Sequence, residues 1–204
     1  MVSRLPLYLR ALKQLLTDGL DVASSQSLGR RLHMTPAQIR KDLGYFGRFG
    51  KQGRGYDIPY LINELEQILG LNQEWPVALV GVGRLGRAIL GYPGFNPEGF
   101  SIRAAFDSSP SVVGQNLGGI EVQSIKNMED ILRNEGIRIA VVAVPAAQTQ
   151  AVIDQLVNAG VQAILNYSPT SPQAPREVKV RNVDPVMALQ SMTYFLRSVP
   201  VPPR

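Results

Sequence analysis

The sequence predicts an α/β protein that begins with a winged helix-turn-helix domain and continues into a Rossmann-like domain built on a parallel sheet. Three observations predict this class. Positive charge is concentrated in the first quarter of the chain, a glycine-rich turn follows an apolar strand, and strands alternate with helices from residue 77 onward. A C-terminal helix completes the chain. The predicted domains are residues 1–75, 76–183 and 184–204.

Composition limits the possible classes of protein. The 204 residues are 45% hydrophobic, which is ordinary for a globular protein. Cysteine is absent, so thiol chemistry is excluded and any redox behaviour requires a bound cofactor. No apolar run approaches the roughly 18 residues of a membrane span, and the N-terminus lacks the pattern of a signal peptide. We therefore expect a cytoplasmic protein without a membrane partner.

Charge is distributed unevenly along the chain. Residues 1–57 contain ten Lys or Arg and four Asp, for a net charge of +6. Residues 58–204 contain 11 basic and 12 acidic side chains, for a net charge of −1. This asymmetry is typical of a nucleic-acid-binding module attached to a near-neutral domain.

The basic segment has the pattern of three short helices. A leucine stripe predicts a helix over residues 3–18, and a second short helix follows Ser25. The third begins at the N-cap Thr35, with Pro36 at its first position and Gln38 placed to complete a capping box. Three such helices with a tight connection between the last two are typical of a helix-turn-helix, whose final helix enters the major groove.

Glycines and basic residues alternate over residues 47–57, which predicts a β-hairpin wing that can reach a phosphate backbone. Phosphate contacts would make the affinity salt-dependent, while Gln38, Arg40 or Lys41 could read base edges. The alternative is a solvated helical surface followed by a flexible linker. The candidate DNA-binding residues are Gln38, Arg40, Lys41, Tyr45, Arg48, Lys51 and Arg54.

A connecting helix over residues 58–69 leads to a domain boundary at residues 72–76. Beyond it, near-continuous apolar strands separated by amphipathic helices indicate a parallel sheet covered on both faces. We expect strands at residues 77–82, 102–107, 120–122, 139–144 and 163–166, and helices at residues 85–90, 128–135 and 148–159.

The first of these strands runs into a G-x-G-x-x-G turn formed by Gly81, Gly83 and Gly86. Gly81 permits the tight turn, Gly83 lets the backbone approach a pyrophosphate, and Gly86 lets the helix pack on the strand. Taken alone the motif is weak, because such turns also occur for packing reasons. It predicts a dinucleotide site if the surrounding strands and helices form.

Asp107 ends the second strand, 21 residues beyond Gly86. An acidic side chain there can accept hydrogen bonds from ribose hydroxyls and disfavours a 2′-phosphate, so we expect NADH or NAD+ as the ligand. The alternative is that Asp107 merely begins a turn. Two further strand ends, at Val144-Pro145 and at Asn166, are expected to line the nicotinamide side.

The predicted Rossmann-like part contains no histidine, no cysteine and no cluster with metal-ligand spacing. A dehydrogenase needs a proton donor or acceptor near the hydride centre. A cofactor site without such groups predicts a sensor and not an enzyme. A small NAD-dependent oxidoreductase and a coenzyme A-binding module remain as alternatives.

The chain ends in an apolar helix for which Asp184-Pro185 supplies the start. A helix that is apolar over most of its surface is expected to be buried, either against a second subunit or within one chain. Its apolar residues are Met187, Leu189, Met192, Phe195, Leu196 and Val199.

With these motifs in place, the chain resembles the Rex family of redox-sensing transcriptional repressors over nearly its whole length. The resemblance rests on residues 38–47 (Gln-Ile-Arg-Lys-Asp-Leu-Gly-Tyr-Phe-Gly), 53–56 (Gly-Arg-Gly-Tyr), 78–86, 92–95 (Tyr-Pro-Gly-Phe), 106–107, 164–169 and 189–196. The first and fourth of these blocks are specific, whereas the glycine turn is not.

The resemblance implies a homodimer with exchanged C-terminal helices that binds an inverted-repeat operator when NADH is scarce. NADH closes such a dimer and releases the DNA, while NAD+ competes weakly. The resemblance further implies a switch in which Tyr92, beside the nicotinamide pocket, and Arg10 alternate as partners of Asp184, with Arg10 paired in the DNA-binding state. A basic residue found near the adenine in many relatives has no counterpart at residues 108–113. The expected cofactor-binding residues are Gly81, Val82, Gly83, Arg84, Leu85, Gly86, Tyr92, Asp107, Val144, Pro145, Asn166 and Asp184, and no metal site is expected.

Overall fold

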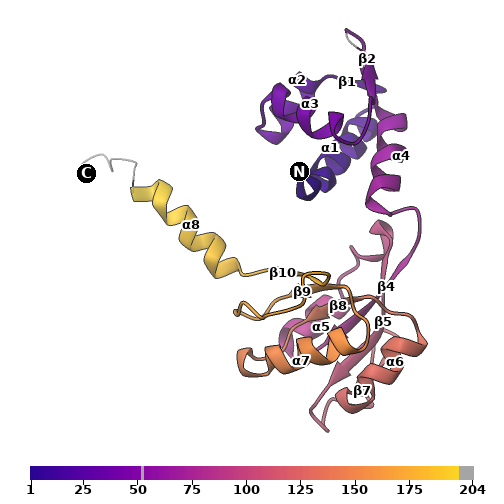
Figure 1. Cartoon of the computed structure of the whole chain (residues 1–204), viewed down its shortest axis with the longest axis vertical. Coiled ribbons are helices and arrows are strands. Elements are labelled where there is room, and N and C mark those ends of the chain that lie inside the picture. Colours follow the sequence, from indigo (N-terminus) through magenta and orange to yellow (C-terminus); the bar gives the residue numbers. More distant parts are fainter. Residues whose placement is uncertain (52, 198–204) are drawn as a thin grey trace. The chain divides into compact units, whose positions relative to one another are not determined.

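The computed structural model describes residues 1–51 and 53–197, and the chain divides into two compact units, Met1–Gln73 and Glu74–Arg204 (Figure 1). Each unit has its own hydrophobic core. Among the described residues, the helices are too short or too polar to cross a membrane.

The described residues of the first unit form four α-helices. Their bounds are α1 Leu5–Thr17, α2 Ser25–Leu32, α3 Pro36–Gly44 and α4 Ile58–Leu69, and a 3-10 turn, η1 Val2–Arg4, precedes them. The N-caps follow the chemistry of the sequence, because the side chains of Ser24, Thr35 and Asp57 each accept a hydrogen bond from a backbone N–H of the first turn. His33 ends α2 in the left-handed conformation, at φ 52°.

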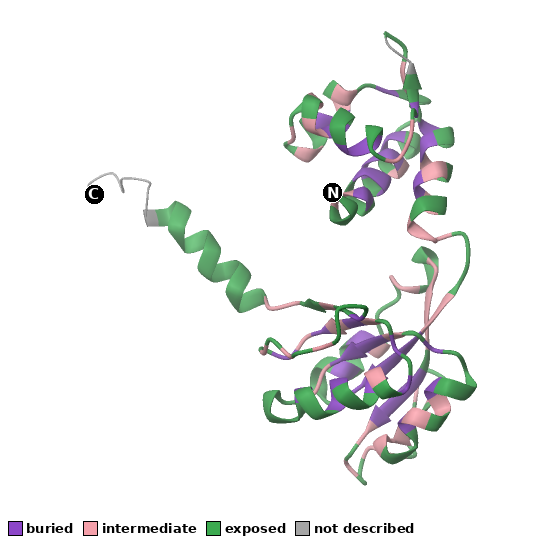
Figure 2. Ribbon diagram, viewed as in Figure 1, coloured by how far each residue is buried: buried purple, intermediate pink, exposed green. Residues whose placement is uncertain are grey.

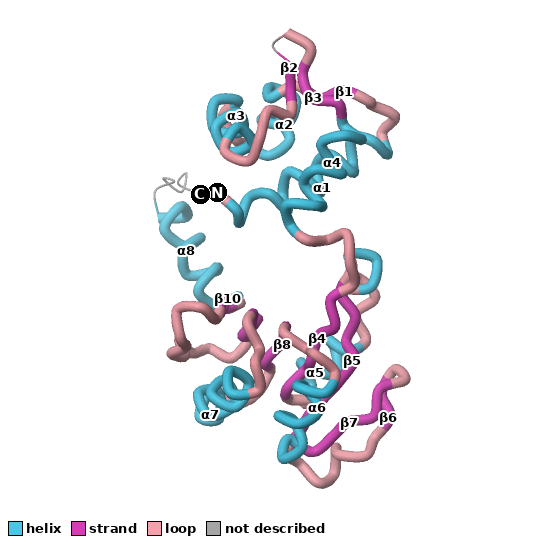
Figure 3. Tube along the Cα trace, turned by 45° about the vertical axis from the view of Figure 1, so that its right-hand side comes forward, coloured by secondary structure: helices cyan, strands magenta, loops and turns pink. Residues whose placement is uncertain are grey.

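A small antiparallel sheet of order β1-β3-β2 completes this unit (Figure 3). Its strands are β1 Val22–Ala23, β2 Gly50–Lys51 and β3 Gly55–Asp57, so β2 and β3 form the predicted hairpin after α3. Buried side chains of α1 to α4 meet in one core, which includes Leu12, Leu28, Ile39, Leu43 and Leu61.

The second unit is built on a seven-stranded sheet of order β10-β9-β8-β4-β5-β7-β6. Six strands are parallel, and β6 is antiparallel to β7. The bounds are β4 Trp75–Val80, β5 Phe100–Asp107, β6 Asn116–Leu117, β7 Ile120–Ser124, β8 Ile139–Val142, β9 Ala163–Asn166 and β10 Lys179–Asn182. Because β5 and β8 flank the first strand, β4, the order reverses there, as in the doubly wound fold.

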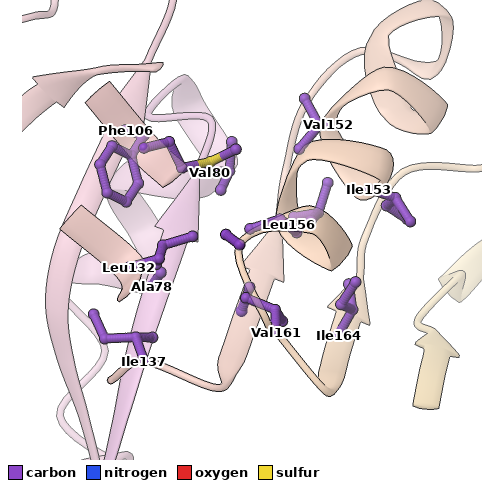
Figure 4. Close-up of a cluster of buried hydrophobic side chains, with 14 of the residues drawn as sticks. Ala78, Val80, Phe106, Leu132, Ile137, Val152, Ile153, Leu156, Val161 and Ile164 are labelled. Carbon is purple, nitrogen blue, oxygen red and sulfur yellow. The ribbon is translucent and has the colours of Figure 1, made fainter. Parts of the chain in front are cut away.

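Helices cover both faces of this sheet. They are α5 Arg84–Leu90, α6 Met128–Asn134 and α7 Ala146–Asn158, with 3-10 turns η2 Asn96–Glu98 and η3 Ile125–Asn127. Alternate residues of β4 point to opposite faces. Ala78 and Val80 pack with Leu132 of α6 and Leu156 of α7 (Figure 4), whereas Leu79 packs on the α5 side.

The structure departs from the predicted elements in several places. β4 ends at Val80 and β8 at Val142, so the glycine turn and Val144 lie beyond the strands and not in them. The strand β10 was not predicted, because its sequence Lys-Val-Arg-Asn has one apolar residue and lies at the sheet edge, where Val180 is half-buried. The short strand β6 was also missed.

The C-terminal helix α8, Pro185–Arg197, begins at the predicted residue. Asp184 caps it, since its Oδ1 accepts hydrogen bonds from the backbone N–H groups of Val186 and Met187. Every side chain from Pro185 to Leu196 is exposed, so the helix is not packed on the sheet of its own unit (Figure 2). Val199 and the rest of the tail lie outside the described residues.

Candidate functional site

The glycine turn joins β4 to α5, and the structure explains a glycine at each of its three glycine positions in a different way. Gly81 has φ +94°, and an added Cβ would lie 2.5 Å from the carbonyl oxygen of Ala143. A Cβ on Gly86 would overlap the Gly81 carbonyl oxygen. A Cβ on Gly83 would meet nothing within 4 Å, and its φ of −72° is open to any residue. The protein's own packing therefore requires Gly81 and Gly86, whereas at Gly83 the backbone is open to a ligand.

A cavity of about 210 Å³ lies beside this turn, between the ends of β4 and β8. In doubly wound sheets, ligands bind at the carboxyl ends of the strands where the strand order reverses, and β4 and β8 meet there. The lining residues are Val80, Gly81, Gly83, Asp107, Ser108, Ile125, Ala143, Val144, Pro145 and Gln148. Three predicted ligand-binding segments, the turn, Asp107 and Val144-Pro145, are thus brought together.

Asp107, at the end of β5, is bound to the glycine turn. Its Oδ2 accepts a hydrogen bond of 2.7 Å from the backbone N–H of Val82, and its Oδ1 accepts one of 2.8 Å from the N–H of Ser109. A carboxylate offers about four acceptor positions, so two remain for a ligand. Asp107 thus starts the turn at Ser109, as the alternative interpretation expects, and it also lines the cavity, while its contact with a ribose stays a prediction.

The other turn residues differ in their surroundings. Arg84 and Leu85 are exposed in the first turn of α5, whereas Val82 is fully buried. Arg87 donates a hydrogen bond to Gln115. Arg84 therefore supplies the exposed cation of the predicted turn segment.

Asn166 is not among the residues that line the cavity and belongs to a buried polar network. Its Nδ2 donates to the Asn182 Oδ1 at 3.0 Å and to the carbonyl oxygen of Ser168 at 3.1 Å, and its Oδ1 accepts from the N–H of Ser168. The Ser168 hydroxyl in turn accepts from Thr149 on α7 at 2.7 Å. Asn166 therefore joins the ends of β9 and β10 to each other.

Tyr92 and Asp184 also lie apart from the cavity-lining residues. Tyr92 is 60% exposed, its ring meets Phe95 edge-on at 5.3 Å, and it covers Gly94, where a Cβ would collide with it. Asp184 is the N-cap of α8. Arg10 is exposed on α1 in the first unit, beside a groove lined by Leu7, Gln14 and Arg31 among others.

The first unit presents a basic surface around α3 and the β2–β3 hairpin. Arg40, Lys41 and Tyr45 are exposed on or just after α3, and Arg48 and Arg54 are exposed around the hairpin. A groove of about 730 Å³ separates α3 from the hairpin, and Arg40 on its wall donates to the Ser25 hydroxyl at 3.0 Å. The side chain of Lys51 lies outside the described part of the chain.

An ion-pair cluster that the sequence did not predict anchors α3. Asp42 is 2% exposed and receives two hydrogen bonds from Arg4, at 2.6 and 2.8 Å, and one from the Tyr8 hydroxyl at 2.5 Å. The Arg4 guanidinium holds the pKa of Asp42 well below its usual range, despite the opposing effect of burial. Burial together with Asp42 raises the pKa of Tyr8 to about 12.

Gln38 belongs to the same cluster, which corrects its predicted role as part of a capping box. Its backbone N–H donates to Thr35 as expected, but its side-chain Nε2 donates to Asp42 Oδ1 at 2.8 Å. In a capping box Gln38 would accept, through Oε1, from the Thr35 backbone N–H. Donation of Nε2 to the ionised Asp42 is a charge-assisted hydrogen bond, and it holds the amide beside Asp42 and away from the N-cap. A charged residue at a core-facing helix position, between Ile39 and Leu43, was the signal that could have revealed the cluster.

Within residues 1–51 and 53–197, no three His, Cys, Asp or Glu side chains come together in a way that could hold a metal ion.

Comparison with protein families assigns each unit separately. Residues 1–44 match the family described as "Putative DNA-binding protein N-terminus", and residues 72–170 match the family described as "CoA binding domain". The second match covers the sheet from before β4 to beyond β9, and so describes the Rossmann-like part.

Curated relatives match both units together, over nearly the full length of the chain. The redox-sensing transcriptional repressor Rex of Chloroflexus aggregans is 53% identical over 196 residues, covering 96% of this chain and 92% of the relative. The repressor of the same name from Streptomyces coelicolor is 42% identical, covering 95% and 75%. These relatives are named as transcriptional repressors and not as enzymes.

Solved structures agree over the same length. RSP, described as a Rex-family repressor, matches with a TM-score of 0.91 and 36% identity in its complex with β-NAD+ and operator DNA, over 96% of this chain and 90% of that one. Its complex with β-NADH matches with a TM-score of 0.86 and 33% identity, over 96% and 92%. The chain belongs to the Rex family of redox-sensing transcriptional repressors.

Proposed function

We propose that this chain is a repressor that binds operator DNA through its first unit and is released when its second unit binds NADH. The observation that carries the proposal is the near-full-length likeness to RSP, which has been crystallised with operator DNA and β-NAD+ and also with β-NADH. The two units of this chain separate the two tasks. The first carries the exposed basic residues, and the second carries the glycine turn and its cavity.

The residues around the cavity fit a dinucleotide. Gly83 leaves space where a pyrophosphate approaches the backbone, and Asp107 keeps acceptor positions for ribose hydroxyls. Val144 and Pro145 supply an apolar wall for the rest of the ligand. The negative charge of Asp107 favours NADH and NAD+ over the 2′-phosphorylated cofactors. In this role the nucleotide acts as a signal, because its binding, and not a reaction, changes the affinity of the protein for DNA.

The exposed apolar face of α8 supports a homodimer in which this helix is buried by the partner subunit. Its exposed side chains include Met187, Leu189, Met192 and Phe195, and an apolar face of this size is stabilised by burial. Exchange of α8 between subunits, an inverted-repeat operator and a cytoplasmic location complete the proposal. Arg10, Tyr92 and Asp184 are proposed as the switch, with Asp184 paired to Arg10 when DNA is bound and to Tyr92 when NADH is bound.

Titration of a protein–operator complex with NADH and with NAD+ tests this function. We expect NADH to dissociate the complex at much lower concentration than NAD+ does. A typical allosteric coupling of about 1–3 kcal/mol corresponds to a several-fold to about hundred-fold weakening of DNA binding. Equal potency of the two nucleotides would contradict redox sensing.

The two alternative functions are separated by simple measurements. Calorimetric competition between coenzyme A and NADH tests the hypothesis that this is a coenzyme A-binding module. The match of residues 72–170 to the family described as "CoA binding domain" is the observation that supports this hypothesis. Asp107 disfavours the phosphorylated ribose of coenzyme A, so we expect NADH to bind without competition. Steady turnover of NADH with a carbonyl substrate would instead favour an oxidoreductase.

A further inference from the structure

Asp42 controls which hydrogen-bonding atoms Gln38 can offer to a ligand. Both residues lie on α3, one helical turn apart, and the Gln38 side chain is half-buried while Asp42 is fully enclosed. The carboxylate receives four hydrogen bonds, two from Arg4, one from Tyr8 and one from Gln38. Its two oxygens are thereby saturated.

An ionised carboxylate accepts hydrogen bonds and cannot donate them. The Arg4 guanidinium keeps the pKa of Asp42 far below the range of physiological pH, so Asp42 remains ionised. The amide end that faces Asp42 must therefore be the NH₂ group, and the carbonyl oxygen Oε1 must point away from it. Within the described part of the chain, Oε1 accepts no hydrogen bond, and one N–H of the amide is left beside it.

We propose that Gln38, oriented by Asp42, is a specificity-determining residue that reads one adenine in each operator half-site. The carbonyl oxygen would accept from the adenine N6 amine, and the remaining N–H would donate to N7. This acceptor–donor pair matches the major-groove edge of adenine. The N-terminal residues of a recognition helix are the ones that reach base edges, and Gln38 is the third residue of α3.

The neighbouring residues favour this assignment. Arg40 is engaged with Ser25, and Lys41 is an exposed ammonium without a fixed acceptor or donor geometry. Neither presents the acceptor that an adenine amine requires. Gln38 and Asp42 thus act as a reading residue and a positioning residue, in an inference that rests on the proposed DNA-binding function.

Selection of bound duplexes from a randomised pool, with wild type and with Gln38→Met, tests the inference. Met preserves the length of the side chain but lacks both hydrogen-bonding groups. We expect the wild-type consensus to contain an adenine whose enrichment disappears in the Gln38→Met pool, while other positions keep theirs. Gln14→Met is the matched control, because Gln14 also donates to an aspartate four residues later, Asp18, at 3.2 Å.

A modified duplex tests the contact without relying on a variant. Replacing that adenine by purine, which lacks the 6-amino group but keeps N7, should weaken wild-type binding by about two- to 13-fold, the range for one hydrogen bond. The same replacement should leave Gln38→Met binding unchanged. A uniform loss of affinity for all duplexes in Gln38→Met would overturn base reading and leave Gln38 as a packing residue. Dependence on a cytosine instead of an adenine would also overturn the assignment.

Failure of the proposed function has a different signature. Wild-type protein that enriches no sequence from the pool would contradict operator binding as such. Wild-type protein that enriches an operator shared in full by Gln38→Met would contradict only the role of Gln38.

Discussion

The carboxylate of Asp107 and the backbone N–H of Val82 are joined by a hydrogen bond of 2.7 Å. The bond ties the end of β5 to the glycine turn that follows β4, so one side chain both shapes the turn and lines the cavity. This double role means that the geometry of the turn and the recognition of ribose depend on the same residue.

Replacing Asp107 by Ala is expected to weaken NADH binding while leaving operator binding of the free protein nearly intact. Hydrogen bonds to charged groups contribute about 1.5–3 kcal/mol, which predicts a loss of about 10- to 150-fold in affinity. Isothermal titration calorimetry measures it. Glu121→Ala, an exposed carboxylate on β7, is the control. An unchanged NADH affinity would remove Asp107 from the site.

Gly83 and Gly86 form a matched pair for separating ligand binding from folding. Gly83→Ala should fold with an unchanged melting temperature, because its Cβ meets no protein atom, but it should bind NADH more weakly. Gly86→Ala should be destabilised by about 1–3 kcal/mol or more, because its Cβ collides with the Gly81 carbonyl oxygen. Thermal unfolding and NADH titration on both variants check this. Normal NADH affinity in Gly83→Ala would contradict the pyrophosphate approach.

The double substitution of Arg40 and Lys41 by Ala should abolish operator binding and leave NADH binding unchanged. Each cation that neutralises a phosphate contributes about 0.9 to the slope of log K against log salt. The non-specific DNA binding that the variant retains should therefore show a shallower salt dependence in a DNA-shift assay. Lys126→Ala with Arg176→Ala removes the same charge from exposed positions of the second unit. Specific, tight binding by the Arg40/Lys41 variant would mean that another surface contacts the DNA.

Acid unfolding should reveal the contribution of Asp42. Its folded-state pKa lies below its unfolded value, so the stability it contributes is present above the unfolded pKa and is lost as pH falls towards the folded one. Between about pH 5 and 3, Asp42→Asn should therefore lose less stability than wild type. Urea unfolding at each pH measures this difference. Parallel curves for the two proteins would show that Asp42 does not drive the acid dependence.

Substituting Leu189 and Leu196 together by Arg should convert a dimer into a monomer. Both side chains are exposed on α8 and lie two helical turns apart, so two charges would enter any interface built on this face. Gln190→Arg, on the same helix, is the control. Sedimentation velocity distinguishes the two states. A dimer that survives both substitutions would contradict burial of α8 by a partner.

The sequence predicts those parts whose cause is local. The cap at Thr35, the glycine turn and the strand ending at Asp107 follow from residues close together in the chain, and the structure has all three. β10 could not be predicted, because an edge strand buries only one face and leaves no apolar run.

The Asp42 cluster could not be predicted either, because it depends on residues far apart in the sequence. Arg4 and Asp42 are 38 residues apart, and nothing in one sequence links a cation before α1 with an anion on α3. Asn166 was predicted to line the ligand site because it ends a strand. Its side chain instead bonds to Asn182, on a strand that the sequence did not reveal. Predictions of ligand contacts at strand ends therefore depend on knowing the neighbouring strand.

The bond between Asn166 and Asn182 also holds the segment from which α8 extends, and this segment is the pivot for any tilt of the helix. The backbone N–H of Val183 donates to the Asn166 carbonyl oxygen at 2.8 Å, and α8 starts two residues later. At 1.5 Å per residue, its 13 residues span about 20 Å. A tilt of about 10° at this pivot would carry the far end of the helix through about 3.5 Å. A small change of angle where β10 ends is therefore enough to move the end of α8 by the size of a side-chain contact.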